Sequence, residues 1–194
     1  AVVAGRRRTA RVARDLDAIL SAGGRSIAVA TRRDSFVNGQ SAGLDRAAPH
    51  ETMSNLLRDE RVQVLVSCLS LRRIVNYGLG LDSCDVAAIM DRRIDSSYED
   101  VFRRGLDVIA RASRGTVVVS AENKLARAAL NALDATRVIL VASDPDHPAI
   151  ATHASAGGAV VTKMSGKNKK RDRIVLQRND EVLVSVPVAR AVAK

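Results

Sequence analysis

The residues with the clearest chemical potential stand at the start of the chain, where an apolar stretch meets a glycine and three arginines. Val2 and Val3 lead into Gly5, and the run Arg6-Arg7-Arg8-Thr9 precedes an amphipathic segment. A glycine between a strand and a helix frames a phosphate-binding loop, which also needs a second glycine, a lysine and a hydroxyl group. Here the second glycine and the lysine are absent. The loop therefore either binds anions through its arginines or is a nucleotide site that has lost its function.

Two further arginine pairs follow predicted core strands, and we group them with the first loop as one candidate anion-binding site. Its members are Gly5, Arg6, Arg7, Arg8, Thr9, Arg72, Arg73, Arg92 and Arg93. Because parallel strands end at the same edge of a sheet, we expect these segments to converge. Close guanidinium groups repel one another unless anions or carboxylates lie among them. An anion site and a plugged, inactive site with ion pairs to Asp34, Asp82 or Asp91 both stay open.

The densest linear run of basic residues lies near the C-terminus and is the candidate partner-binding segment. Its members are Lys167, Lys169, Lys170, Arg171 and Arg173. Such a run is either a solvated loop or a contact with an acidic protein surface, a polyanion or a larger complex. No aromatic residue interrupts the run, so base stacking is not supported.

Composition limits the function classes. The formal net charge is +10, which favours an anionic partner such as nucleic acid, or simply keeps the protein soluble. Cys68 and Cys84 lie in apolar runs and are predicted to be buried thiols in a reducing compartment, without a catalytic role. The three histidines are not spaced from each other or from the two cysteines as metal ligands are, so we expect no metal and no cofactor. No apolar run approaches ~18 residues, so we expect a cytoplasmic protein that contacts no membrane, and a homo-oligomer stays open.

Apolar runs alternate with helical patterns along most of the chain. The predicted strands are residues 2–4, 26–30, 62–68, 85–90, 116–120 and 137–142. Strands that are apolar on both faces and alternate with helices predict an α/β fold with a mostly parallel sheet flanked by helices. After residue 157 three strands predict a small antiparallel β appendage at the C-terminus. We therefore expect a core of residues 1–156 and an appendage of residues 157–194 within one domain.

Several predicted helices position these strands. Val12, Leu16, Ile19 and Leu20 share one face of the helix that follows the first loop. Pro49 is expected to open a helix with Met53, Leu56 and Leu57 on one face. Ser96 or Ser97 is expected to cap a helix that begins with Glu99 and Asp100 and carries Phe102, Leu106 and Ile109 as apolar residues. A further helix is expected at residues 122–133.

One run in the middle of the chain resembles a known family. The sequence Tyr77-Gly-Leu-Gly-Leu-Asp-Ser-Cys-Asp-Val-Ala-Ala-Ile-Met90 is similar to the central domain of the Mur ligase family, most of all to that of the cyanophycin synthetases. The segments Asp59–Ser67, Ile94–Asp100 and Asp144–Pro148 resemble further parts of that domain, in the same order. The resemblance implies a P-loop-like α/β fold that binds ATP, activates a carboxylate as an acyl phosphate and joins it to an amine.

The same resemblance implies that the family's catalytic groups are missing from this chain. Gly5 matches the first glycine of the family loop, but Thr9 stands where the lysine belongs and Ala10 where the first threonine belongs. Cys68 stands in place of the glutamate that holds Mg²⁺, and Gly105 in place of the helix lysine that many members carbamylate. The histidine that follows the next strand is also replaced, because an Asp-Arg-Arg sequence stands there.

Three functions stay open at this point. The first is a non-catalytic relative of the Mur ligase central domain, a pseudoenzyme that acts as a binding, scaffold or assembly subunit. The second is an ATP-dependent carboxylate–amine ligase module with an altered site, or a site that a partner completes. The third is a basic protein that binds a polyanion or nucleic acid, which a steep salt dependence of binding would reveal.

Overall fold

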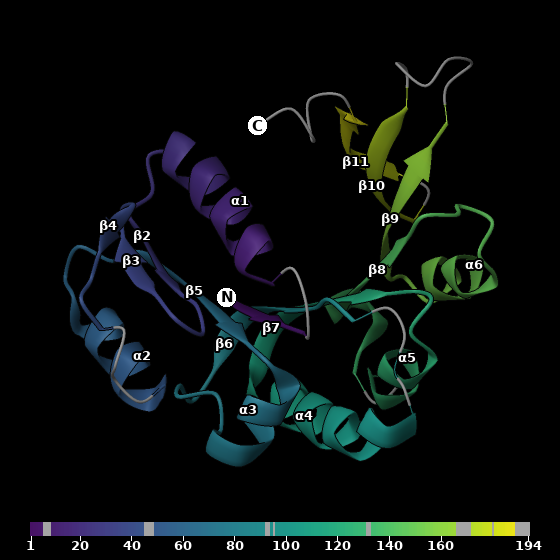
Figure 1. The fold of residues 1–194 in the computed structure, drawn as a ribbon. Helices are drawn as coiled ribbons and strands as arrows, with labels where there is room; N and C mark the ends of the chain where they lie inside the picture. Colours follow the sequence, from purple (N-terminus) through teal and green to yellow (C-terminus); the bar gives the residue numbers. More distant parts are fainter. Residues whose placement is uncertain are drawn as a thin grey trace. The chain divides into compact units, whose positions relative to one another are not determined.

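The computed structural model of the chain describes residues 1–5, 9–44, 49–91, 94, 96–130, 133–165, 172–179 and 181–188 (Figure 1). The chain forms two compact units, residues 1–115 (unit 1) and residues 116–194 (unit 2). Each unit is built around its own part of the β-sheet structure, and each is described by itself. The expected boundary after residue 156 stays a prediction.

Unit 1 contains a mixed sheet whose strand order is β6-β1-β5-β2-β3-β4. The strands are β1 (Val2–Ala4), β2 (Ile27–Ala30), β3 (Ser35–Val37), β4 (Gln40–Ser41), β5 (Val64–Leu69) and β6 (Cys84–Ile89). The four strands from β6 to β2 are parallel, while β3 and β4 add an antiparallel hairpin beside β2. This arrangement confirms the parallel sheet that the apolar runs predict in this part of the chain.

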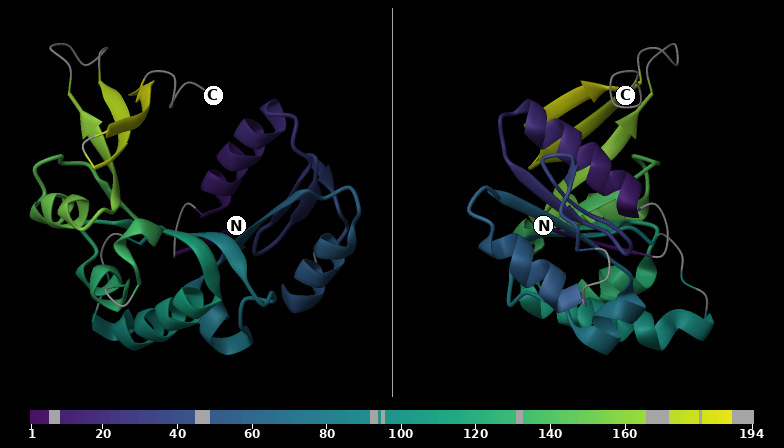
Figure 2. Two further views of the ribbon diagram at one scale, coloured as in Figure 1. Left: turned by 180° about the vertical axis from the view of Figure 1, so that it is seen from behind. Right: turned by 60° about the vertical axis from the view of Figure 1, so that its left-hand side comes forward.

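The helices of unit 1 are α1 (Thr9–Ala22), α2 (Pro49–Arg58), α3 (Leu71–Tyr77), the 3₁₀ turn η1 (Ser96–Tyr98) and α4 (Glu99–Ala112). Helix α1 packs Ala13 into a cluster with Val3, Val66 and Cys68. Helix α4 carries the completely buried side chains of Phe102, Leu106 and Ile109, as predicted. Figure 2 shows α1, in purple, lying over the strands of unit 1.

Three details of the predicted helices are wrong. Ile19 is 67% exposed, because it lies about 120° around α1 from the buried Ala13. Leu57 is 56% exposed, whereas its neighbours on the inner face of α2, Met53 and Leu56, are buried. Neither predicted serine caps α4: η1 intervenes, and Tyr98 stands at the N-cap without a side-chain cap hydrogen bond.

Unit 2 has the strand order β7-β8-β9-β10-β11. Its strands are β7 (Ser113–Ser120, which begins in the last residues of unit 1), β8 (Val138–Ala142), β9 (Ala159–Met164), β10 (Arg173–Arg178) and β11 (Glu181–Pro187). Strands β7, β8 and β9 are parallel, and β9, β10 and β11 are antiparallel. The antiparallel appendage after residue 157 is therefore confirmed.

The helices of unit 2 are α5 (Lys124–Leu130), the 3₁₀ turn η2 (Ala135–Arg137) and α6 (Pro148–Ser155). The sequence predicts α5 but only a turn before α6. Helix α6 begins at Pro148. Proline fits the first turn of a helix because backbone N–H groups have no intrahelical acceptor there, so the N–H that proline lacks is not needed. The His147 side chain caps it by accepting a hydrogen bond from the Ala149 N–H. In the part of the chain that the structure describes, no helix has the length and apolar character that a membrane span requires.

Candidate anion-binding loop at the carboxyl edge of the unit 1 sheet

Three parallel strands of unit 1 end together beside the first loop. Ala4 of β1 is in register with Leu69 of β5 and with Ile89 of β6. The Gly5 N–H continues this pairing by donating to the Leu69 carbonyl oxygen at 3.1 Å. The Met90 N–H likewise donates to the Ala4 carbonyl oxygen at 2.8 Å. The chain segments that follow β1, β5 and β6 therefore start from one edge, as the parallel arrangement requires.

Gly5 is the residue that permits this close approach. A Cβ atom at this position would lie 3.0 Å from the Met90 Cβ and 3.6 Å from the Asp91 Oδ1. The loop therefore passes directly beside the end of β6, and the Asp91 carboxylate lies next to it. Of the three acids that the sequence offers as partners of the arginines, Asp91 is the one that these distances place at the loop.

Most arginines of the candidate anion-binding site lie outside the described residues. This applies to Arg6, Arg7, Arg8, Arg92 and Arg93. Their convergence with Arg72 and Arg73 therefore stays a prediction. Thr9 is the first residue of α1, and its side chain is within reach of Gly5, because a Cβ there would lie 3.5 Å from the Thr9 Cγ2.

Arg72 and Arg73 lie at the start of α3 and have different surroundings. The Arg72 side chain is exposed, and its backbone N–H donates to the Tyr98 hydroxyl oxygen at 3.2 Å. The Arg73 N–H donates to the Oγ of Ser70, the N-cap of the helix. Within the described residues, no ion pair joins either arginine to Asp34 or Asp82, so these two carboxylates do not plug the edge through them.

Arg73 instead belongs to a second basic group that the sequence analysis missed. Its side chain lines a small cavity together with Arg32, Arg33 and Asp34, which follow β2. The Arg73 Nε is buried and has no hydrogen-bond partner in the described part of the chain. The signal was present in the sequence, because Arg32 and Arg33 also follow a core strand and reach the same sheet edge as the other candidates.

Cys68 occupies the end of β5, where the resemblance implies a metal-binding glutamate. Its side chain is 4% exposed, and its thiol donates to the Thr9 carbonyl oxygen at 3.3 Å. Burial raises the pKa of the Cys68 thiol to about 11, so the group is neutral near pH 7. Mg²⁺ prefers oxygen ligands, above all carboxylates and phosphates. A neutral thiol that is already hydrogen-bonded does not fit the metal of a Mg·ATP complex, and it instead ties β5 to the start of α1.

Gly105 stands where the resemblance implies the family's helix lysine, and it packs against Leu71. A Cβ at this position would lie 2.8 Å from the Leu71 Cδ2 and 3.1 Å from the Leu71 Cβ. Gly105 and Leu71 are both buried, and they let α4 and α3 approach closely. A long side chain at this position has no room unless the two helices separate.

Of the five basic residues in the candidate partner-binding segment, the structure describes Arg173. Lys167, Lys169, Lys170 and Arg171 lie outside the described residues. The guanidinium group of Arg173 is held across the β10–β11 pair: its Nε donates to the Ser185 Oγ at 2.6 Å and a terminal nitrogen donates to the Ser185 carbonyl oxygen at 3.0 Å. Arg173 therefore stabilises the hairpin, and its role in partner contact stays a prediction.

The expected absence of a metal site can be compared with the geometry only in part. Among the residues that the structure describes, no group of three or more histidine, cysteine or acidic side chains is arranged to hold a metal ion. Both cysteines are buried and unpaired, as their apolar surroundings predict.

Comparison with known proteins gives matches to solved structures and none to sequences. No protein-family model and no curated protein matches the chain. A structure of UDP-N-acetylmuramoyl-L-alanyl-D-glutamate–2,6-diaminopimelate ligase aligns with a TM-score of 0.62 at 10% identity over 95% of this chain. Folylpolyglutamate synthase of Mycobacterium tuberculosis, complexed with ADP and AMPPCP, aligns with a TM-score of 0.52 at 13% identity over 93% of the chain. Escherichia coli FolC, in complex with DHPP and ADP, aligns at 16% identity with a TM-score of 0.48.

The chain spans 38% of the first of these proteins and 48% of each of the other two. At these identities the likeness concerns the fold alone. The particular resemblance to the cyanophycin synthetases stays a prediction. The chain therefore has an α/β fold, mostly parallel with a C-terminal antiparallel appendage, that is similar to the central domain of Mur ligases and folylpolyglutamate synthases.

Proposed function

We propose that this protein is a non-catalytic relative of the ligase central domain, a pseudoenzyme that acts as a binding, scaffold or assembly subunit. The observation that carries the proposal is Cys68. A buried neutral thiol, bonded to the Thr9 carbonyl oxygen, stands at the strand end where the resemblance implies a carboxylate for Mg²⁺. Phosphoryl transfer depends on cations positioned around the γ-phosphate. The end of β5 therefore lacks the carboxylate that would hold the metal in that arrangement.

The packing around Gly105 supports the same conclusion. The resemblance implies a lysine at this position, whereas the contact with Leu71 fills the space that its side chain would need. Two of the missing catalytic groups are thus replaced by residues that stabilise the fold: Cys68 connects β5 with α1, and Gly105 lets α3 approach α4.

The surface of β11 supports a role in assembly. Val182, Leu183 and Val184 are each about half exposed, at 55%, 47% and 49%. In the described part of unit 2, β11 has one strand neighbour, β10, so its other edge is open to a further strand. Adjacent exposed apolar residues on an open strand edge are typical of a contact surface. The basic segment with Lys167, Lys169 and Lys170 is the proposed contact for an acidic partner or polyanion.

A working ligase with an altered site is the second candidate, and Asp91 favours it. Its carboxylate lies beside Gly5 and supplies an oxygen ligand from β6 in place of the one missing from β5. In that case a partner chain or the arginines of the loop would complete the site. The two candidates differ in one measurable property, which is Mg²⁺-dependent binding of ATP.

Isothermal titration of the full chain with ATP separates the candidates. In Mg²⁺ we expect no saturable binding, with a Kd weaker than about 1 mM. ATP with a chelator in place of Mg²⁺ is the control, because arginines bind the triphosphate without the metal and an anion site then gives the same weak heat in both titrations. Saturable binding that requires Mg²⁺ and is lost in Asp91→Asn contradicts the pseudoenzyme proposal and favours the second candidate.

A further inference from the structure

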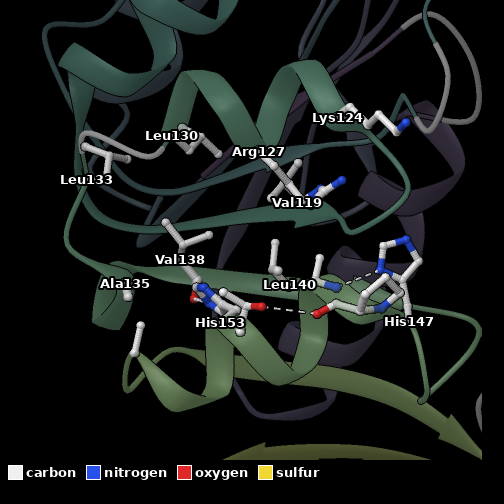
Figure 3. Close-up of a pocket in the computed structure, with 14 residues that line it drawn as sticks. Val119, Lys124, Arg127, Leu130, Leu133, Ala135, Val138, Leu140, His147 and His153 are labelled. Atoms are coloured by element: carbon white, nitrogen blue, oxygen red, sulfur yellow. Dashed lines mark hydrogen bonds between the residues drawn. The ribbon is translucent and has the colours of Figure 1, made fainter.

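Unit 2 contains a cavity of about 560 Å³ between α5 and α6, over one face of β7 and β8 (Figure 3). Its size is within the range of pockets that hold small organic ligands. All of its lining residues belong to unit 2. Neither the resemblance nor the proposed function uses it.

The two ends of the cavity differ in chemistry. Lys124, Arg127 and His147 gather at one end, and Leu133 and Ala135 lie at the other (Figure 3). The walls between the ends are mostly apolar, and they are formed by Val119, Leu130, Val138 and Leu140. The polar atoms of Thr152 and His153, which also line the cavity, already bond to the carbonyl oxygens of Pro148 and Val138. A ligand that fits this cavity therefore has one polar end and an apolar body.

The hydrogen-bonding groups at the polar end are donors. The Lys124 ammonium and the Arg127 guanidinium carry no acceptor. The Nδ1 of His147 accepts a hydrogen bond from the Ala149 N–H at 3.2 Å, so in the neutral ring the Nε2 carries the proton and is a donor too. Among the described residues that line the cavity there is no Asp or Glu. A cluster of donors with a net positive charge matches an anionic group.

The Arg127 side chain provides an energetic reason for an anion to bind in the cavity. Its Nε is buried and has no hydrogen-bond partner among the described residues. A buried donor without an acceptor is unfavourable, and a charged donor more so. Lys124, on the same helix three residues earlier, is also a cation with donors only, so it cannot supply the missing acceptor. An anion in the cavity would supply the acceptor that the protein itself lacks.

We propose that this cavity binds an organic anion that has an apolar body. Its carboxylate, sulfonate or phosphate group contacts Arg127, Lys124 and His147, and its aromatic or aliphatic part lies among Leu130, Val138 and Leu140. An inorganic anion does not use the apolar walls, and a neutral apolar compound leaves the Arg127 Nε unpaired. The site therefore discriminates by requiring both parts in one molecule.

Three probes test the requirement for both parts, using the full chain and isothermal titration. The first is 8-anilinonaphthalene-1-sulfonate, which has both parts. The second is N-phenyl-1-naphthylamine, which lacks the sulfonate, and the third is inorganic sulfate. We expect the first to bind with one-to-one stoichiometry and at least about tenfold more tightly than either of the others, because hydrogen bonds to a charged group contribute most. Equal affinity of the sulfonate and the neutral compound, or binding to several sites, overturns the proposal.

Variants locate the site. Arg127→Gln and Lys124→Gln are each expected to weaken binding of the sulfonate by about tenfold. Arg104→Gln, which removes the same charge from an exposed position of α4 in unit 1, is the matched control and is expected to leave the affinity unchanged. Should Arg127→Gln not fold, the exposed Lys124 position still decides the matter. Affinity that is unchanged in Lys124→Gln, or equally reduced in Arg104→Gln, shows that the sulfonate binds elsewhere and contradicts the proposal.

Discussion

Cys68→Glu is expected to be about 3–4 kcal/mol less stable than Cys68→Gln at neutral pH. The two side chains are nearly equal in size, so the comparison isolates the charge. Cys68 is 4% exposed, and its thiol donates a hydrogen bond to the Thr9 carbonyl oxygen. A carboxylate at position 68 would be repelled by that oxygen. Burial raises the pKa of such a glutamate by roughly 2–3 units, and each unit is worth about 1.4 kcal/mol.

The sign of the pH dependence follows from the raised pKa. A glutamate whose pKa is higher in the folded state than in the unfolded state is stabilised in its protonated form. The two variants are therefore expected to be equally stable below about pH 4, and the glutamate variant loses stability as the pH rises through its folded pKa. Urea unfolding of both variants at about pH 4 and about pH 7.5 measures this loss.

A glutamate variant that stays as stable as the glutamine variant at pH 7.5 would contradict this account. It would mean that cations surround position 68 and compensate a carboxylate, as a functional anion or metal site requires. The same unfolding curves measured with Mg²⁺ then show whether the metal binds, since a ligand of the folded state raises its stability.

Gly105→Lys is expected to lower the free energy of unfolding by about 3 kcal/mol or more. The new Cβ overlaps Leu71, and the rest of the side chain has to enter the α3–α4 contact with its charge or push the helices apart. Ala110→Lys introduces the same side chain at a partly exposed position of α4 and is the matched control, with an expected change below about 1 kcal/mol. Chemical denaturation of both variants measures the difference.

The outcome for Gly105 bears on function as well as on stability. If Gly105→Lys is as stable as Ala110→Lys, the lysine of the ligases has room here, and the packing argument for lost catalysis is wrong. If it is destabilised as expected, the position has been committed to helix packing, and the lysine cannot be restored without further changes at Leu71.

The sequence predicts the strands well because their signal is local. β5 and β8 are mainly apolar on both faces and bounded by polar residues, which is the pattern of a buried parallel strand. Helices α3 and α6 are not predicted, and their seven and eight residues give only a weak helical period. Helix α5 is just as short, but it lies within the longer segment 122–133 that is predicted as a helix. The wrong positions, Ile19 and Leu57, lie at the margins of their apolar stripes, where exposure depends on the neighbouring elements and not on the spacing.

The candidate site could be predicted only in outline. The edge at which Gly5, Leu69 and Met90 meet follows from parallel strands, and the structure has it. The group of Arg32, Arg33 and Arg73 depends on the direction in which α3 leaves β5, which no local pattern specifies. The cavity at Arg127 and His147 requires α5 and α6 to face each other, and α6 itself was not predicted.

The most direct test of the account is ATP turnover by the full chain, measured as inorganic phosphate released from Mg·ATP in the presence of candidate carboxylate and amine substrates. The account predicts no release above the background of a buffer control, and no difference among the wild type, Thr9→Ala and Cys68→Ala. Release by the wild type that is abolished in Thr9→Ala or Cys68→Ala would contradict the pseudoenzyme proposal.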